Sequence, residues 1–92
     1  MSYLMVHFWP GGTDEQYRAM IGTLHPGGVL PEGQTHHAAG PTEGGYLVSA
    51  LWDTKEHSDA FGAHIASVMP IEGGFQGPPE ERTAAVVNEA SS

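Results

Sequence analysis

The sequence predicts an α+β fold with the element order βαββαβ, because apolar strand-like segments alternate with capped helical segments along its 92 residues. The clearest unit is a strand over 46–52 that ends in Trp and leads directly into a helix over 54–69. A similar unit, a strand over 2–9 followed by a helix from Thr13 to about His25, precedes it. This order is typical of a four-stranded antiparallel sheet with both helices on one face, the ferredoxin-like arrangement.

Local signals bound the first strand and helix. The Pro10-Gly11-Gly12 segment stops the strand, and Thr13 and Gln16 then have the spacing of a capping box. Apolar side chains recur every three or four residues after this box, at Tyr17, Met20, Ile21 and Leu24. The Pro-Gly-Gly segment over 26–28 predicts the end of the helix.

The second helix has two candidate caps. Asp53 and Glu56 have capping-box spacing, and Thr54 is the alternative N-cap. The remaining elements are a loop over 29–33, a short strand over 34–39, a turn over 40–45, an irregular segment over 70–81 and a last strand over 82–88. We expect residues 89–92 to fray.

Both faces of the predicted sheet are apolar. In the first strand, one face carries Leu4, Val6 and Phe8, and the other carries Tyr3, Met5, His7 and Trp9. Helices cover one face, and a second copy of the chain is the simplest cover for the other. Because a chain this short buries only about 60–65% of its unfolded surface, we expect one domain over 1–92 that forms a homodimer.

Composition argues against several classes of protein. The net charge of −8, with three basic residues against eleven acidic ones, makes this an acidic protein and disfavours binding to nucleic acid or an anionic membrane. The absence of cysteine excludes disulfides and Cys-based metal or redox sites. No segment approaches the roughly 20 apolar residues of a membrane span, and the N-terminus lacks the basic start of a signal peptide. We therefore expect a cytoplasmic protein without a membrane partner.

Histidine is the most informative residue type, because six of the 92 residues are His and its pKa lies near neutral pH. Strand alternation places His7 with Met5 and Trp9, and sends the neighbours His36 and His37 to opposite faces. We expect a cavity between the second helix and the sheet that collects the site residues. The catalytic candidates are His7, His37 (or His36 in its place) and His64, and the substrate-binding candidates are Tyr17, Trp52 and Phe61. A structural role is the competing interpretation for each His, and a core position is the competing interpretation for Trp52.

The sequence contains no motif for a metal site, a phosphate-binding loop or a serine nucleophile. There is no HExxH segment, and adjacent His36 and His37 cannot chelate one ion from one face, so no metal site is predicted. None of the glycine pairs matches a phosphate-binding loop, and no serine lies in a nucleophile-elbow sequence. We expect no cofactor.

Three segments carry a resemblance that covers nearly the whole chain: Phe8 to Tyr17, His37 to Tyr46, and the helix entry Leu51-Trp52-Asp53. They resemble small actinobacterial members of the dimeric α+β barrel superfamily, to which antibiotic-biosynthesis-monooxygenase-like proteins belong. The resemblance implies a homodimer whose two sheets form a barrel, with a ligand pocket between each sheet and its own helices. It is less specific for chemistry, because one fold hosts many functions.

Two hypotheses of function follow. The first is a small cofactor-independent enzyme of the monooxygenase, cyclase or isomerase type, in which a pocket His abstracts a proton from a hydrophobic aromatic or polyketide-like molecule. The second is a non-catalytic dimeric protein, binding a small molecule or associated with stress. A haem-degrading branch of the superfamily implies a helix-2 His as iron ligand and a Trp near the end of strand 3. This chain offers His64 or His57 and Trp52, but it has His7 where that branch has Asn and few cations to hold propionates.

Overall fold

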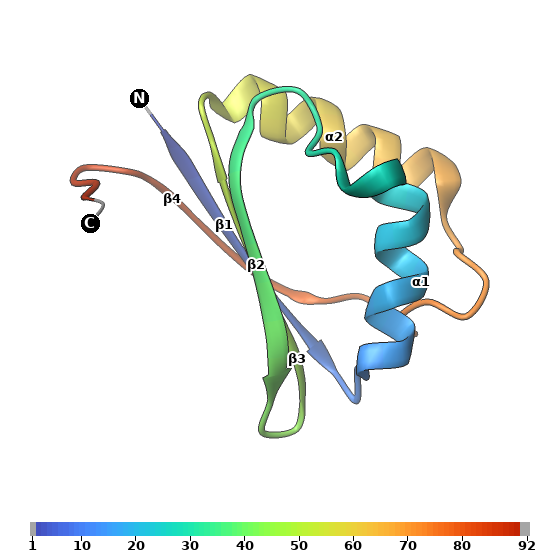
Figure 1. Cartoon of the computed structure of the whole chain (residues 1–92). Helices are drawn as coiled ribbons and strands as arrows, with labels where there is room; N and C mark the ends of the chain where they lie inside the picture. The colour runs from blue at the N-terminus through green and yellow to red at the C-terminus, as the bar shows by residue number, and fades with distance from the viewer. Residues whose placement is uncertain (1, 91–92) are drawn as a thin grey trace.

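The computed structural model describes residues 2–90 and confirms the ferredoxin-like α+β fold (Figure 1). Residues 91–92, part of the segment expected to fray, lie outside the described chain. The elements are β1 (Tyr3–Pro10), α1 (Asp14–Leu24), the 3-10 turn η1 (Pro26–Gly28), β2 (Gln34–Thr42), β3 (Gly45–Trp52), α2 (Lys55–Val68) and β4 (Glu80–Ala85).

The four strands form one antiparallel sheet in the order β2-β3-β1-β4, and both helices lie on one face of it (Figure 1). The register places His7 opposite Val48 and Glu81, and His37 opposite Ala50. Since residues opposite one another share a face, His7, His37 and Glu81 all lie on the helix-covered face. Within residues 2–90, no helix is both long and apolar enough to span a lipid bilayer.

The N-cap of α1 is the predicted residue, whereas the N-cap of α2 is the alternative candidate, Thr54. Thr13 and Gln16 form the predicted capping box of α1, with both reciprocal hydrogen bonds present. For α2 the Asp53–Glu56 box is wrong and Thr54 is the N-cap, because its Oγ1 accepts from the backbone N–H of His57 at 3.2 Å. The Asp53 carboxylate instead lies 2.6 Å from Nδ1 of the His57 ring.

Two strand boundaries differ from the prediction. β2 continues through Thr42, so the turn into β3 shortens to Glu43 and Gly44, and Gly44 takes a left-handed φ of 81° that glycine tolerates. The last strand runs from Glu80 to Ala85 rather than over 82–88. Its extent is set by pairing with β1, from Phe8 opposite Glu80 to Tyr3 opposite Ala85, which local propensity does not encode.

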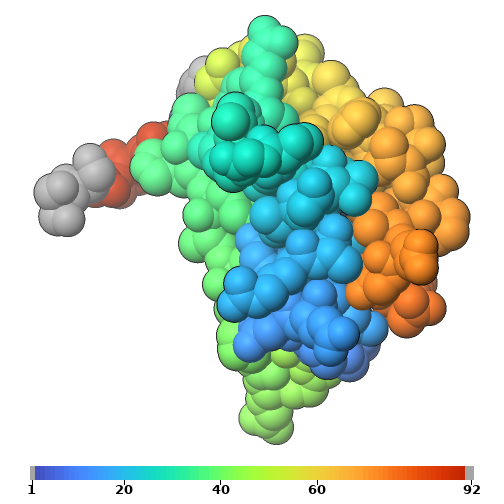
Figure 2. All heavy atoms as spheres, turned by 45° about the vertical axis from the view of Figure 1, so that its right-hand side comes forward, coloured from blue at the N-terminus to red at the C-terminus, as the bar shows by residue number. Residues whose placement is uncertain are grey.

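The core lies between the sheet and the helices. It is formed by the buried side chains of Trp9, Met20, Tyr46, Val48 and Phe75. The Trp9 and Phe75 rings stack with centroids 4.6 Å apart, so the segment after α2 contributes to the core although it has no regular structure. Figure 2 shows this segment beside α1 on one face of the molecule, and Gly73 of the segment lies next to Ala19 of α1.

The other face of the sheet is open. In residues 2–90 no helix covers it, and Figure 1 shows the chain after β4 leaving on that side. Leu4 is 37% exposed and Leu47 is 41% exposed on this face, where Val6 and Phe8 also lie. Exposed leucines in the middle of a sheet are the pattern expected of a surface that another molecule covers.

Candidate functional site

A cavity of about 320 Å³ lies between the sheet and the two helices. The sheet supplies Met5, His7 and Trp9 from β1, Val48 from β3, and Gln34 and His37 from β2. The rest of the wall comes from α1, α2 and the segment after α2, with Tyr17, Met20, Leu24, Phe61, Ile65 and Phe75 among its side chains. The lining is largely apolar with a few polar groups, as in typical small-molecule sites.

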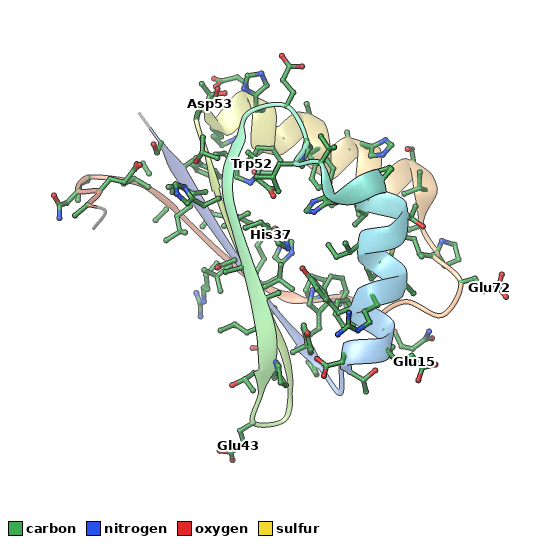
Figure 3. The ribbon with its side chains drawn as sticks, viewed as in Figure 1. Glu15, His37, Glu43, Trp52, Asp53 and Glu72 are labelled. Carbon is green, nitrogen blue, oxygen red and sulfur yellow. The ribbon has the colours of Figure 1, made fainter. Side chains whose placement is uncertain are left out.

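Tyr17, His37 and His25 form the polar cluster on the β2 side of this cavity. The Tyr17 hydroxyl lies 2.6 Å from Nε2 of His37, and the His25 ring meets the His37 ring edge-on with centroids 4.7 Å apart. The fold brings them together because Tyr17 lies on the inner face of α1, His25 is the C-cap of that helix, and His37 projects from the sheet. Figure 3 shows His37 pointing from β2 toward the helices.

Burial favours the uncharged forms of all three side chains of this cluster. Burial lowers the pKa of His37, and the neighbouring His25 lowers it further. Burial also lowers the pKa of His25 and raises the pKa of the Tyr17 hydroxyl. His37 Nδ1 is buried and has no hydrogen-bond partner in the described chain. A neutral imidazole with a free ring nitrogen can accept a proton from a bound molecule.

His7 and Glu81 form a second polar pair on the β4 side of the cavity. His7 Nε2 lies 2.6 Å from a carboxylate oxygen of Glu81, and the side chains are 16% and 58% exposed. The sequence places Glu81 at the end of the irregular segment over 70–81, but its register opposite His7 in β4 makes it part of the lining. His7 and His37 are two strands apart and two residues out of register, so their Cα atoms are separated by about 12 Å.

The sequence-based candidates separate into two groups. His7, His37, Tyr17 and Phe61 line the cavity. His64 is exposed and does not line it, because α2 turns Phe61, Gly62 and Ile65 inward and leaves His64 at the edge. Placing His64 in the cavity was therefore an error.

Trp52 is also absent from the lining, because it is 1% exposed and packs behind Phe61 with ring centroids 5.5 Å apart. Trp52 is therefore a core residue, as its competing interpretation predicted, and not part of the cavity wall. His57, the other helix-2 histidine, faces Asp53 and Glu32 outside the cavity. With neither His57 nor His64 lining the cavity, the geometry does not support a haem iron ligand from α2.

Sequence reasoning missed His25, Gln34 and Glu81 as members of the site. His25 stands at the end of a helix, Gln34 at the start of a strand, and Glu81 in a segment predicted to be irregular, so none carries a periodic signal. Among residues 2–90, no three His, Asp or Glu side chains are grouped so that they could hold a metal ion.

Comparison with known proteins finds similarity in structure and none in sequence. No family model matches the chain, and no curated protein matches it. Mycobacterium tuberculosis Rv0793 superposes with a TM-score of 0.72 at 12% identity, covering 99% of this chain and 100% of that one. An inferred antibiotic biosynthesis monooxygenase from Chloroflexus aurantiacus J-10-fl gives a TM-score of 0.66 at 14% identity, covering 99% and 98%.

A third structure is the monooxygenase ActVA-Orf6 of Streptomyces coelicolor in complex with nanaomycin D. Its TM-score is 0.56 at 16% identity, and the match covers 99% of this chain and 91% of that one. The chain has the fold of these proteins. The likeness therefore agrees with the resemblance to antibiotic-biosynthesis-monooxygenase-like proteins over the full length of the described chain, and at these identities it is a statement about the fold.

Proposed function

We propose that this protein is a small cofactor-independent enzyme of the monooxygenase or cyclase type that acts on a hydrophobic aromatic or polyketide-like molecule. The observation that carries the proposal is the neutral Tyr17–His37 pair inside a largely apolar cavity. A base that is uncharged near pH 7 and shielded from water is suited to abstracting a weakly acidic proton.

The proposed step uses His37 as general base. In the tautomer that donates Nε2–H to the Tyr17 oxygen, Nδ1 keeps a free lone pair. An activated C–H or O–H of the ligand transfers its proton to Nδ1, and the electron pair remains on the ligand as a delocalised enolate or phenolate. Tyr17 then stabilises the imidazolium by accepting from Nε2–H, while burial and the neighbouring His25, which lower the pKa of His37, favour return of the proton.

The two reaction types diverge after this step. In cyclisation or isomerisation, the carbanion attacks within the ligand or is reprotonated by His37, so no other reagent is needed. In oxygenation, molecular oxygen is the co-substrate: it forms a C–O bond with the carbanion of a CH₂ group, His37 returns the proton to give a hydroperoxide, and loss of water leaves a carbonyl. The complex of ActVA-Orf6 with nanaomycin D supports this class of ligand for the fold.

The proposal includes a homodimer. The open apolar sheet face is on the side opposite the cavity, so a second copy could cover it while both cavities stay accessible. His7 and Glu81 are the second candidate proton-transfer pair, placed to act at the other end of a ligand that spans the cavity. A non-catalytic binding protein remains the competing hypothesis.

The adjacent histidines of β2 provide a matched test. The probe is 1,8-dihydroxyanthrone in aerated buffer, followed by absorbance and by oxygen consumption. His37→Gln removes the proposed base, whereas His36→Gln changes an exposed His that does not line the cavity. We expect His37→Gln to lower kcat at least a hundredfold and His36→Gln to leave it within twofold. Equal activity in both variants would contradict His37 as the base. The absence of turnover in the wild type and in both variants would favour the non-catalytic binding protein.

A further inference from the structure

The start of β2 contains a β-bulge that changes the direction of Gln34. Gln34 is paired with Trp52, whereas His36 is paired with Leu51 and His37 with Ala50. In a regular strand, residues three apart point to opposite faces. The register shift between Gln34 and His36 instead brings Gln34 and His37 to the same, helix-covered face. Bulges are frequent next to active sites because they redirect a side chain in this way.

Gln34 is buried at the cavity wall without a partner for its side-chain oxygen. The residue is 7% exposed and lines the cavity, and Oε1 forms no hydrogen bond within the described chain. His37 Nδ1, in another lining residue, is also buried and unpartnered within residues 2–90, and so is Nε1 of Trp52, which lies behind the lining. Figure 3 shows Trp52 and His37 on the same side of the sheet. Buried polar groups are normally satisfied by protein or by ordered water, so the two unpartnered atoms of lining residues, Gln34 Oε1 and His37 Nδ1, point to a water molecule or a ligand as their partner.

The charge of the lining limits what those partners can be. The three basic side chains, Arg18, Lys55 and Arg82, are not part of the lining, and Glu81 is its one carboxylate among the described residues. A carboxylate ligand would find no cation beside Gln34 and would meet an acidic protein. An uncharged hydroxyl can donate one hydrogen bond and accept another, and a turned Gln amide offers either role.

We propose that Gln34 is a specificity-determining residue, whose amide binds an uncharged phenol or enol hydroxyl of the ligand beside the free Nδ1 of His37. The inference rests on the proposed function, since it assumes that the cavity receives an aromatic ligand. The hydroxyl proton then faces His37 Nδ1, and the Gln34 amide, turned with its N–H toward the ligand, donates to the hydroxyl oxygen before the transfer and to the negative oxygen after it. Ligands with a methyl group or a carboxylate at this position are disfavoured.

Three naphthalene probes and one isosteric substitution test this role. 2-Naphthol, 2-methylnaphthalene and 2-naphthoate differ only in the group that would meet Gln34, and their affinities are measured by quenching of tryptophan fluorescence. We expect the wild type to bind 2-naphthol about threefold to tenfold more tightly than 2-methylnaphthalene, and 2-naphthoate most weakly. Gln34→Met should abolish the preference for the hydroxyl while the affinity for 2-methylnaphthalene stays within twofold. Gln76→Met, at an exposed residue outside the lining, is the control and should keep the preference.

Thermal unfolding without ligand separates this role from a structural one. Because Oε1 is unpartnered, we expect Gln34→Met to have an unfolding midpoint equal to or above that of the wild type. A lowered midpoint with an unchanged preference among the probes would overturn the proposal and assign Gln34 to the fold. A wild type that binds no probe would contradict the ligand-binding cavity itself, whereas binding with the same preference in Gln34→Met would contradict only the role of Gln34.

Discussion

The hydroxyl of Tyr17 lies 2.6 Å from Nε2 of His37 and joins α1 to β2 across the cavity. The partners are separated by 20 residues, and both are shifted toward their neutral forms by burial, which raises the pKa of Tyr17 and lowers that of His37. The bond therefore orients an imidazole that is ready to accept a proton. It also connects the first helix to the edge of the sheet.

Removal of the Tyr17 hydroxyl tests this orientation. Tyr17→Phe keeps the ring that stacks on Tyr46, with centroids 5.1 Å apart, and removes only the hydrogen bond to His37. We expect the free energy of unfolding to fall by about 1 kcal/mol and kcat with 1,8-dihydroxyanthrone to fall about tenfold to a hundredfold, with KM nearly unchanged. An unchanged kcat would assign the bond to stability alone.

The sequence predicted more of the fold than of the site, for a physical reason. Capping boxes and helical periodicity act over a few residues, so the helix from Asp14 to Leu24 was identified correctly. Strand ends depend on partners: β4 ends where β1 stops pairing, and the bulge at Gln34 needs the register of β3. His64 was misplaced because helical spacing gives the angle between side chains but not the rotation of the helix about its axis.

Trp52 should be required for stability. It is 1% exposed and packs on Phe61, so Trp52→Ala leaves a large void behind the cavity wall. We expect a loss of about 3–5 kcal/mol in the free energy of unfolding, measured by urea denaturation. Trp52→Phe retains part of the packing and removes the unpartnered Nε1, and should cost less. A loss below about 1 kcal/mol for the alanine variant would contradict the core position.

The His57–Asp53 pair, which lies outside the cavity, should make the free energy of unfolding depend on pH. The hydrogen bond that His57 Nδ1–H donates to the Asp53 carboxylate raises the pKa of His57 above its ordinary 6.5, and the charges of Asp53 and Glu32 raise it further. A histidine whose pKa is higher in the folded than in the unfolded protein stabilises the fold. This stabilisation is fully present below about pH 6.5 and is lost as the pH rises through the pKa of the folded protein. Asp53→Asn should return the His57 pKa toward 6.5 in an NMR titration. An unchanged pKa in this variant would show that the pair does not form in solution.

The open sheet face should carry the dimer interface. Leu47 is 41% exposed, points away from the cavity and lies opposite Phe8 and Gly40 on the neighbouring strands. We expect sedimentation to show a dimer for the wild type and a monomer for Leu47→Asp, because a buried, unpaired carboxylate is strongly unfavourable at an apolar interface. Ala63→Asp, on the exposed side of α2, is the control and should remain dimeric. A monomeric wild type at micromolar concentration would contradict the homodimer.

His7 distinguishes a role in the cavity from a role between subunits. Its ring lies on the helix-covered face and its Nε2 is 2.6 Å from Glu81, on the side of the sheet opposite Leu47. We therefore expect His7→Phe, which keeps an aromatic ring beside Trp9, to lower probe binding or turnover at least tenfold while the dimer persists in sedimentation. Glu81→Gln keeps the size of the partner and removes its charge, so it should produce a smaller change in the same direction. Weakened dimerisation with intact binding in His7→Phe would reject the cavity role and assign the His7–Glu81 pair to contacts between subunits.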